Sequence, residues 1–275
     1  MHCKMVGLPF RHPLSLMKWI LIFTCVFLSA QQAHAEKKRN LKILVLIIAS
    51  DQVPLFEEFQ KTWRAYMQED PEHVEAYFIK GDPTLSQSYE IRGDTIWSRT
   101  EEGYVPESAG ILNKTILSMK ALLPKIRKSD YVLRTNLSSF FVFPRLLKFL
   151  EKLPSARCYC GSATAGGSTV ASGSGFILSP DLVELLVAHR KKFLNNATMA
   201  DDVLIGRFLQ EKRVKLHTFP RLDILALDDW LMLRDRIPSD VFHFRARVSD
   251  RSSQVFAEDI SIHADLLKIF YGKSL

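Results

Sequence analysis

The sequence is poor in cysteine, which excludes a fold built on disulfides. It holds four cysteines in 275 residues, and two of them, Cys3 and Cys25, lie in the first 35 residues. The other two, Cys158 and Cys160, are separated by one residue on an expected strand, and their side chains are expected on opposite faces. A disulfide between them would be strained, and two ligands alone do not make a zinc site. Two packed thiols are therefore the favoured interpretation.

Long apolar segments are also missing. The run Trp19–Ala30 covers 12 residues, whereas a membrane-spanning helix needs about 20. A short basic start, Met17-Lys18, precedes this run, and the small-x-small sequence Ala33-His-Ala35 follows it. This order predicts a signal peptide over residues 1–35, with an uncleaved short membrane anchor as the alternative. The protein is accordingly expected to be exported, to the outside, the periplasm or the lumen of the secretory pathway.

The chain carries no strong charge of either sign. It has 37 Lys and Arg against 30 Asp and Glu, and three of the basic residues lie within 1–35, which leaves 34 against 30. This mild excess is compatible with ligands that carry phosphate. No basic run with interleaved aromatic residues is present, so nucleic acid is not an expected partner. With 47% apolar residues and no evident linker, residues 36–275 are expected to form a single domain.

Strands and helices are expected to alternate in the first half. Continuous apolar runs predict strands, and apolar residues at steps of three and four predict helices. The expected strands cover residues 41–49, 74–79, 94–99 and 131–133, and the expected helices cover 53–67 and 106–123. A loop is expected at 80–93, and a polar break at 134–139. This alternation predicts an α/β fold with a mainly parallel sheet.

The second half has a less regular pattern. Strands are expected at 157–160, 170–178 and 241–248. Helices are expected after Ser179, over 201–210 and over 262–270, and Ser179 stands where a helix N-cap belongs. The stretch 161–175 is rich in Gly and Ser.

Four segments, in order, are similar to the β-1,3-glycosyltransferase and fringe group. Residues 102–120 resemble its Asp-Ser-Tyr-x-Asn-Leu-Thr-x-Lys-Thr helix, and residues 130–141 its Tyr-Leu-Lys-Thr-Asp-Asp-Asp-Val-Phe strand. Residues 171–179 are similar to its Gly-Gly-Gly-Tyr-Val-Leu-Ser, and residues 200–206 to its Glu-Asp-Val-Tyr-Val-Gly. The resemblance implies a GT-A-like, Rossmann-type fold, in which a mainly parallel sheet has flanking helices.

The acidic residues of the family's strand are missing here. In the family they hold a metal ion on the diphosphate of the sugar nucleotide, but this chain has Asn136, Leu137 and Ser138 at these places. Mg²⁺ and Mn²⁺ usually take at least one carboxylate ligand. No metal site is therefore assigned, and Mn²⁺ is not favoured. Three alternatives stay open: cationic side chains in place of the metal, a metal held by other acids, or a degenerate relative without activity.

The donor site is expected to combine neutral oxygens, a glycine-rich turn and cations. The glycines would let the backbone approach a sugar closely and adopt positive φ. Arg pairs suit phosphate oxygens, and a solvated edge strand is the alternative for the cations of 243–247. The expected donor-binding residues are Arg134, Asn136, Ser138, Gly173, Ser174, Gly175, His243 and Arg245.

Asp202, or its neighbour Asp201, is the expected catalytic base. In the family an acid at this place takes the proton from the acceptor hydroxyl as it attacks the sugar. Acids at a helix start also stabilise the helix dipole without any further function. The resemblance implies an inverting transfer of a hexose or N-acetylhexosamine from a nucleotide-sugar, expected to be UDP-linked, to a hydroxyl of a glycan. The alternative is a catalytically inactive carbohydrate-binding module on the same fold.

Overall fold

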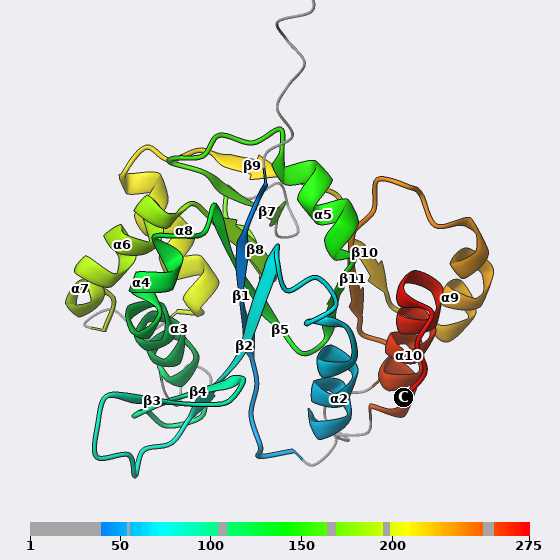
Figure 1. The fold of residues 1–275 in the computed structure, drawn as a ribbon, viewed down its shortest axis with the longest axis horizontal. Helices are drawn as coiled ribbons and strands as arrows, with labels where there is room; N and C mark the ends of the chain where they lie inside the picture. The colour runs from blue at the N-terminus through cyan, green and yellow to red at the C-terminus, as the bar shows by residue number, and fades with distance from the viewer. Residues whose placement is uncertain (1–39, 54–55, 104–108, 164–168, 195–198, 250–255) are drawn as a thin grey trace, which may run out of the picture. The chain divides into compact units, whose positions relative to one another are not determined.

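An eight-stranded sheet lies at the centre of the computed structural model, which describes residues 40–53, 56–103, 109–163, 169–194, 199–249 and 256–275 (Figure 1). Within these residues the strands of the sheet are β1 (Ile43–Ile48), β2 (Val74–Gly81), β3 (Tyr89–Arg92), β4 (Thr95–Ser98), β5 (Tyr131–Asn136), β7 (Tyr159–Ala163), β8 (Ala171–Leu178) and β9 (Leu216–Thr218). Residues 41–275 form one compact unit.

The strand order is β3-β4-β2-β1-β5-β8-β7-β9. The four neighbours β4, β2, β1 and β5 are all parallel. Strand β8 is antiparallel to both β5 and β7, and β3 is antiparallel to β4 at one end of the sheet. The expected α/β fold with a mainly parallel sheet is confirmed.

Strand β1 explains why the sheet has a core on each face. Successive side chains of a strand point to opposite faces, and its five residues Ile43 to Ile47 are all buried. Ile43, Val45 and Ile47 belong to one hydrophobic core, and Leu44 and Leu46 belong to the other. A strand buried on both faces must have helices on both sides.

Helices cover both faces of the sheet (Figure 1). Those contributing to the core of Leu44 are α3 (Gly110–Ala121), α4 (Leu123–Ile126), α6 (Pro180–Ala188) and α8 (Asp201–Glu211), with the short α7 (Arg190–Leu194) after α6. The core of Val45 is built with α2 (Phe56–Tyr66), α5 (Phe143–Leu150) and α10 (Ala257–Tyr271). The expected helices at 53–67 and 106–123 are confirmed in their described parts, and Pro106 lies outside the described residues.

A second sheet has three strands, one from the middle of the chain and two from its C-terminal part. It has the order β10-β11-β6, with β10 (Leu222–Ile224), β11 (His243–Ala246) and β6 (Ser139–Phe141). Helix α9 (Leu227–Leu233) and the 3₁₀ turn η1 (Arg234–Arg236) connect β10 to β11. Because β11 lies in the middle of this sheet, the residues from His243 are not on an edge strand.

Several expected boundaries are wrong. The polar break starts too early at Arg134, because β5 continues to Asn136 and only residues 137–138 separate it from β6. The loop 80–93 contains β3, whose mostly exposed side chains give no apolar pattern. The short helices α4 and α5, which were not expected, each have a proline in the first turn, Pro124 and Pro144, where a missing N–H costs nothing.

Other features of the sequence have a plain structural outcome. Cys158 and Cys160 are buried free thiols, as expected, and burial raises the pKa of Cys158 to about 11. The expectation of opposite faces is wrong, because both thiols belong to the core of Val45 and every second residue of a strand shares one face. Ser179 occupies the N-cap position of α6, but its hydroxyl bonds Asp181 and the Cys158 N–H instead of capping the helix. The predicted signal peptide lies outside the described residues. Within the described part, no helix has the length and apolarity to cross a membrane.

Candidate functional site

A cavity of about 470 Å³ opens at the carboxyl ends of β1 and β5. These strands are neighbours, yet β2, which follows β1 in sequence, lies on the other side of β1. The order of the sheet therefore reverses between β1 and β5. In open α/β sheets, ligands bind in the crevice outside the carboxyl ends of the strands at such a reversal. The position alone makes this cavity the leading candidate site.

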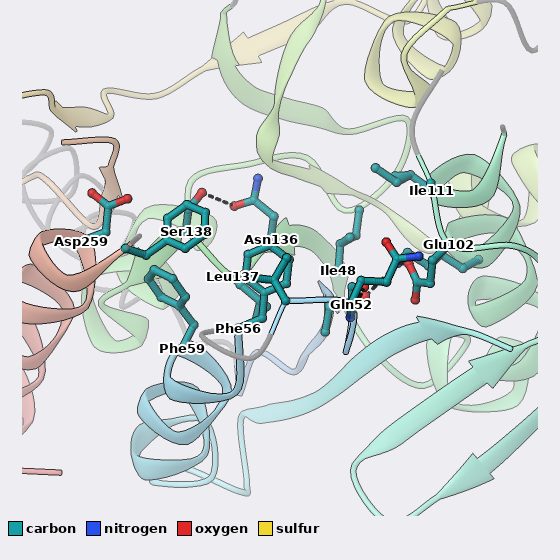
Figure 2. Close-up of a pocket in the computed structure, with 16 residues that line it drawn as sticks. Ile48, Gln52, Phe56, Phe59, Glu102, Ile111, Asn136, Leu137, Ser138 and Asp259 are labelled. Carbon is teal, nitrogen blue, oxygen red and sulfur yellow. Dashed lines mark hydrogen bonds and ion pairs between the residues drawn. The ribbon is translucent and has the colours of Figure 1, made fainter. Parts of the chain in front are cut away.

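The cavity has an apolar end and a polar end (Figure 2). Phe56 and Phe59 of α2 and Phe256 next to α10 line the apolar end, and the rings of Phe56 and Phe256 lie 5.7 Å apart. In Figure 2, Ser138 and the Asp259 carboxylate also lie near the phenylalanine rings, and Asn136 lies between them and Glu102. The cavity thus combines aromatic surface with a few polar groups, as small-molecule sites commonly do.

Asn136 and Ser138 are held by a small hydrogen-bond network. The Oδ1 of Asn136 accepts bonds from the hydroxyls of Ser138 and Ser139, each at 3.1 Å. Their oxygens are neutral amide and hydroxyl groups that already bond one another. This set does not fit a Mg²⁺ or Mn²⁺ ion, which needs carboxylate or free oxygen ligands. Across the described residues, no group of three or more His, Cys, Asp or Glu side chains is placed to hold a metal.

Lys114 of α3 brings a buried positive charge to the polar end of the cavity. Its ammonium donates to the Ala49 carbonyl at 2.7 Å and forms an ion pair with Glu102. Glu102 in turn accepts the Gly81 N–H at 2.6 Å. Burial lowers the pKa of Lys114, and the nearby Glu102 carboxylate opposes this effect. Lys114 is the one basic side chain among the described lining residues.

Arg134 forms a second buried ion pair, with Asp201. The guanidinium also donates to the Gly173 carbonyl and lies 5.3 Å from the centre of the Phe176 ring. Arg134 is 2% exposed and Asp201 is 7% exposed. Burial raises the pKa of Asp201, and the positive charge of Arg134 acts in the opposite direction. Neither residue lines the described cavity, so this pair is closed to it.

Asp202 is more accessible than Asp201. It is half-buried, and its Oδ2 accepts the Gly173 N–H at 2.6 Å, while Oδ1 accepts the Val203 N–H at 2.9 Å. Gly173 of β8 is therefore linked to both expected catalytic acids. Its N–H bonds Asp202 directly, and its carbonyl accepts a bond from Arg134, which is paired with Asp201. Of the two acids, Asp202 has the freer carboxylate.

The glycines of β8 make room for side chains of this chain. A Cβ at Gly175 would lie 2.6 Å from the Phe141 ring, and one at Gly173 would lie 2.8 Å from the Asp202 carboxylate. Neither glycine has positive φ. The expected positive φ is therefore wrong, whereas a close approach of this backbone to a sugar stays a prediction. Ser174 bonds Arg221 at 2.6 Å, and none of the three residues lines the described cavity.

His243 does not supply the positive charge expected of it. Its ring is fully buried and stacks on Phe141 with the centroids 4.1 Å apart. Burial, together with Arg221 and Arg245, holds its pKa well below the usual range, so the imidazole is neutral. Arg245 is half-buried in β11, opposite Ser139 and Asp223 in register. Of the eight expected donor residues, Asn136 and Ser138 line the cavity.

Sequence reasoning missed the charged residues that line the cavity. Lys114 lies in the first segment of the resemblance, residues 102–120, but no site role is predicted for it there. Glu102 lies 12 positions away in the sequence, and Asp259 comes from the C-terminal helix. Asp259 is buried and accepts the backbone N–H groups of Val248 and Ser249, at 2.8 and 3.3 Å. No local sequence pattern predicts that the folded chain brings these three charged residues to the wall of one cavity.

Among the comparisons with known proteins, only the one with solved structures found similar proteins. No family model matches the sequence, and no curated protein matches it. The chain is similar to a glycosyltransferase involved in glycosylation of the major capsid of PBCV-1, at 10% identity and a TM-score of 0.44, over 78% of this chain and 98% of that one. It is also similar to the glycosyltransferase GlyE of Streptococcus pneumoniae TIGR4, at 10% identity and a TM-score of 0.42. That match covers 77% of this chain and 55% of GlyE.

Proposed function

We propose that this protein is a glycosyltransferase that binds a nucleotide-sugar in the cavity at the ends of β1 and β5. The observation that carries the proposal is the position of this cavity. It lies where the strand order reverses, and Asn136 and Ser138 line it. These two residues occupy the places that, in the resemblance to the β-1,3-glycosyltransferase group, belong to the diphosphate of the donor. Sequence resemblance and sheet topology thus independently support one location.

The proposed reaction is a single displacement with inversion. The acceptor hydroxyl attacks the anomeric carbon of the sugar, and the bond from that carbon to the diphosphate oxygen breaks. Asp202 takes the hydroxyl proton, and the nucleoside diphosphate leaves. Neither acid lines the described cavity, and Asp202 is preferred to Asp201 because its carboxylate is half-buried, whereas Asp201 is paired with Arg134 inside the protein. The donor is proposed to be UDP-linked, the acceptor a glycan, and the protein exported.

Sugar binding without transfer is the second candidate function. It is favoured by the charges of the cavity, because the described lining carries one cation, Lys114, against the carboxylates of Glu102 and Asp259. A diphosphate must add further negative charge to this surface, whereas an uncharged sugar does not. Aromatic side chains at the other end of the cavity also suit the apolar face of a sugar.

Calorimetric titration combined with a transfer assay tests the proposal. The purified protein would be titrated with UDP, GDP and ADP, each with and without Mn²⁺, and then incubated with the matching sugar nucleotides and oligosaccharide acceptors. The expected result is saturable binding of one nucleotide and appearance of an extended oligosaccharide. Binding of free oligosaccharides, with no nucleotide bound and no transfer, would instead establish the second candidate.

A further inference from the structure

The ion pair of Lys114 and Glu102 joins a fully buried ammonium to a carboxylate that is 12% exposed. Both side chains line the cavity, and Lys114 is 1% exposed. Taking charges out of water is costly, and an uncompensated buried charge is strongly destabilising. If the Glu102 carboxylate moves away from Lys114, another anion must therefore take its place beside the ammonium.

We propose that Lys114 and Glu102 form an anion-exchange pair, in which a phosphate group of the ligand replaces the Glu102 carboxylate at the Lys114 ammonium. This inference rests on the proposed function for the identity of the ligand, a nucleoside diphosphate. It gives the protein a cation for the diphosphate in the same cavity as Asn136 and Ser138, which stand at the places of the metal-holding acids in the resemblance.

The surroundings of Lys114 fit this role. An ammonium has three donors, and one of them bonds the Ala49 carbonyl at 2.7 Å, which fixes the Nζ atom at the carboxyl end of β1. A second donor goes to Glu102. A phosphate oxygen that enters from the cavity can accept the bond now made to Glu102, while the bond to Ala49 keeps the ammonium in place.

Glu102 can lose its contact with Lys114 and keep its hydrogen bond from the Gly81 N–H. Its Oε1 accepts the Gly81 N–H at 2.6 Å, and its Oε2 contacts Lys114. The backbone around it is packed closely, because a Cβ at Gly81 would lie 2.7 Å from the Thr100 carbonyl and a Cβ at Gly110 would collide with the Glu101 carbonyl. In the proposed exchange the Glu102 side chain therefore moves while the backbone around it stays packed against Gly81 and Gly110.

The other candidate cations are less suitable. Arg134 is closed off by its pair with Asp201 and does not line the described cavity. His243 is buried against Phe141. Lys80 is also buried beside an acid, with Nζ 2.5 Å from Asp51, but it does not line the described cavity. Lys80 is for this reason the matched control.

Calorimetric titration with inorganic pyrophosphate, UDP and uridine tests the exchange. Glu102→Gln removes the competing carboxylate, so pyrophosphate and UDP should bind about 10-fold more tightly, as expected for one hydrogen bond to a charged group. The double variant Lys114→Met with Glu102→Gln removes both charges together. It should lose pyrophosphate binding and bind UDP no better than uridine.

Thermal unfolding provides a second readout that a purely structural pair would not give. Glu102→Gln leaves Lys114 without its counter-ion, so pyrophosphate should raise its Tm more than it raises that of the unaltered protein. Lys80→Met should behave like the unaltered protein in all titrations. Each variant would first be checked for a cooperative unfolding transition.

The outcomes separate this inference from the proposed function. If UDP binds equally well to the double variant, or if Glu102→Gln binds pyrophosphate no more tightly, the exchange is refuted while nucleotide binding stands. If pyrophosphate binding depends on Lys114 but UDP gains nothing from its nucleoside, the nucleotide-sugar proposal fails and the anion site stands. Absence of binding by all three probes to the unaltered protein refutes both.

Discussion

Two buried ion pairs lie near the carboxyl ends of neighbouring strands, and they differ in what surrounds them. Arg134 and Asp201 are enclosed by Gly173 and Phe176 and do not line the described cavity. Lys114 and Glu102 line it. In the first pair Arg134 of β5 contacts Gly173 and Phe176 of β8 and Asp201 of α8, so the pair joins these three elements. The second pair forms part of the cavity wall, so the same kind of contact becomes a candidate for recognition.

The difference also explains why residue type alone misleads. Arg134 has the better chemistry for phosphate, since a guanidinium binds two oxygens at once. Its burial against Asp201 removes it from the cavity, however, and leaves the simpler ammonium of Lys114 as the cation that lines it. Both cations are almost fully buried, at 1% exposure for Lys114 and 2% for Arg134, so their position relative to the cavity, and not exposure or donor geometry, distinguishes them.

The largest expected effect is on transfer. Asp202→Asn keeps the shape of the side chain and can still accept the Gly173 N–H, but it cannot take a proton. The transfer rate should fall by roughly 10²–10⁴-fold, with Tm and nucleotide affinity close to those of the unaltered protein. Initial rates with a saturating donor would measure this. A rate within threefold of the unaltered protein would mean that Asp202 is only a charge at the start of α8.

The enclosed pair should dominate stability. Arg134→Met leaves the Asp201 carboxylate buried and uncompensated, which should cost about 3–5 kcal/mol. The double variant with Asp201→Asn should recover most of this loss, because no charge remains buried. Unfolding in urea, followed by circular dichroism, gives both values. A loss below about 1 kcal/mol for Arg134→Met would contradict the enclosure of the pair.

A histidine beside the cavity should make stability depend on pH. His263 of α10 is buried, with its Nε2 3.3 Å from the Ser138 carbonyl, and burial lowers its pKa to about 4. The unfolded chain binds a proton near pH 6.5, so stability should fall as the pH drops from 6.5 towards 4. His263 should contribute about 2–3 kcal/mol of this fall by pH 4.5.

The neutral variant His263→Gln isolates this contribution. Asp201, whose pKa is raised by burial, acts with the opposite sign and is present in both proteins. The difference in urea unfolding between pH 7 and pH 4.5 should therefore be smaller in His263→Gln. Parallel stability curves for the two proteins would show that His263 is protonated in the folded state.

The smallest expected effect concerns the packing of β8 away from the cavity. Gly175→Ala places a Cβ 2.6 Å from the Phe141 ring and 3.0 Å from His243, and overpacking of this kind costs about 1–3 kcal/mol. Phe141→Leu, introduced together with it, should relieve part of the strain, which a double-mutant cycle would detect. Strict additivity of the two changes would contradict the contact.

The parts of the fold that could be predicted are those with a local signal. Strands β1, β2 and β5 are apolar runs, and a residue buried on both faces of a sheet must be apolar whatever its neighbours are. Strand β3 could not be found, because its side chains are mostly exposed. Helix α5 was missed because Phe143 and Pro144 look like the end of a strand, although a proline also suits a first helical turn.

The candidate site likewise contains some residues that the sequence predicts and others that it does not. Asn136 and Ser138 were predicted because polar residues after an apolar strand mark the carboxyl edge of a sheet. The burial of Lys114 could not be predicted, because a lysine on an amphipathic helix is normally on its exposed face. Its burial follows from contacts with Ala49 and Glu102, which lie 65 and 12 positions away.

The central claim is that the ligand occupies the cavity between the ends of β1 and β5, and blocking the cavity tests it most directly. Ile111 of α3 lines the cavity and is half-buried, so Ile111→Trp should fill part of it. Ile91→Trp, at an exposed position of β3 that does not line the cavity, is the control. Calorimetric titration with UDP should show binding to the unaltered protein and to Ile91→Trp, and its loss in Ile111→Trp at an unchanged Tm. Equal UDP binding by Ile111→Trp would place the ligand elsewhere and contradict the account.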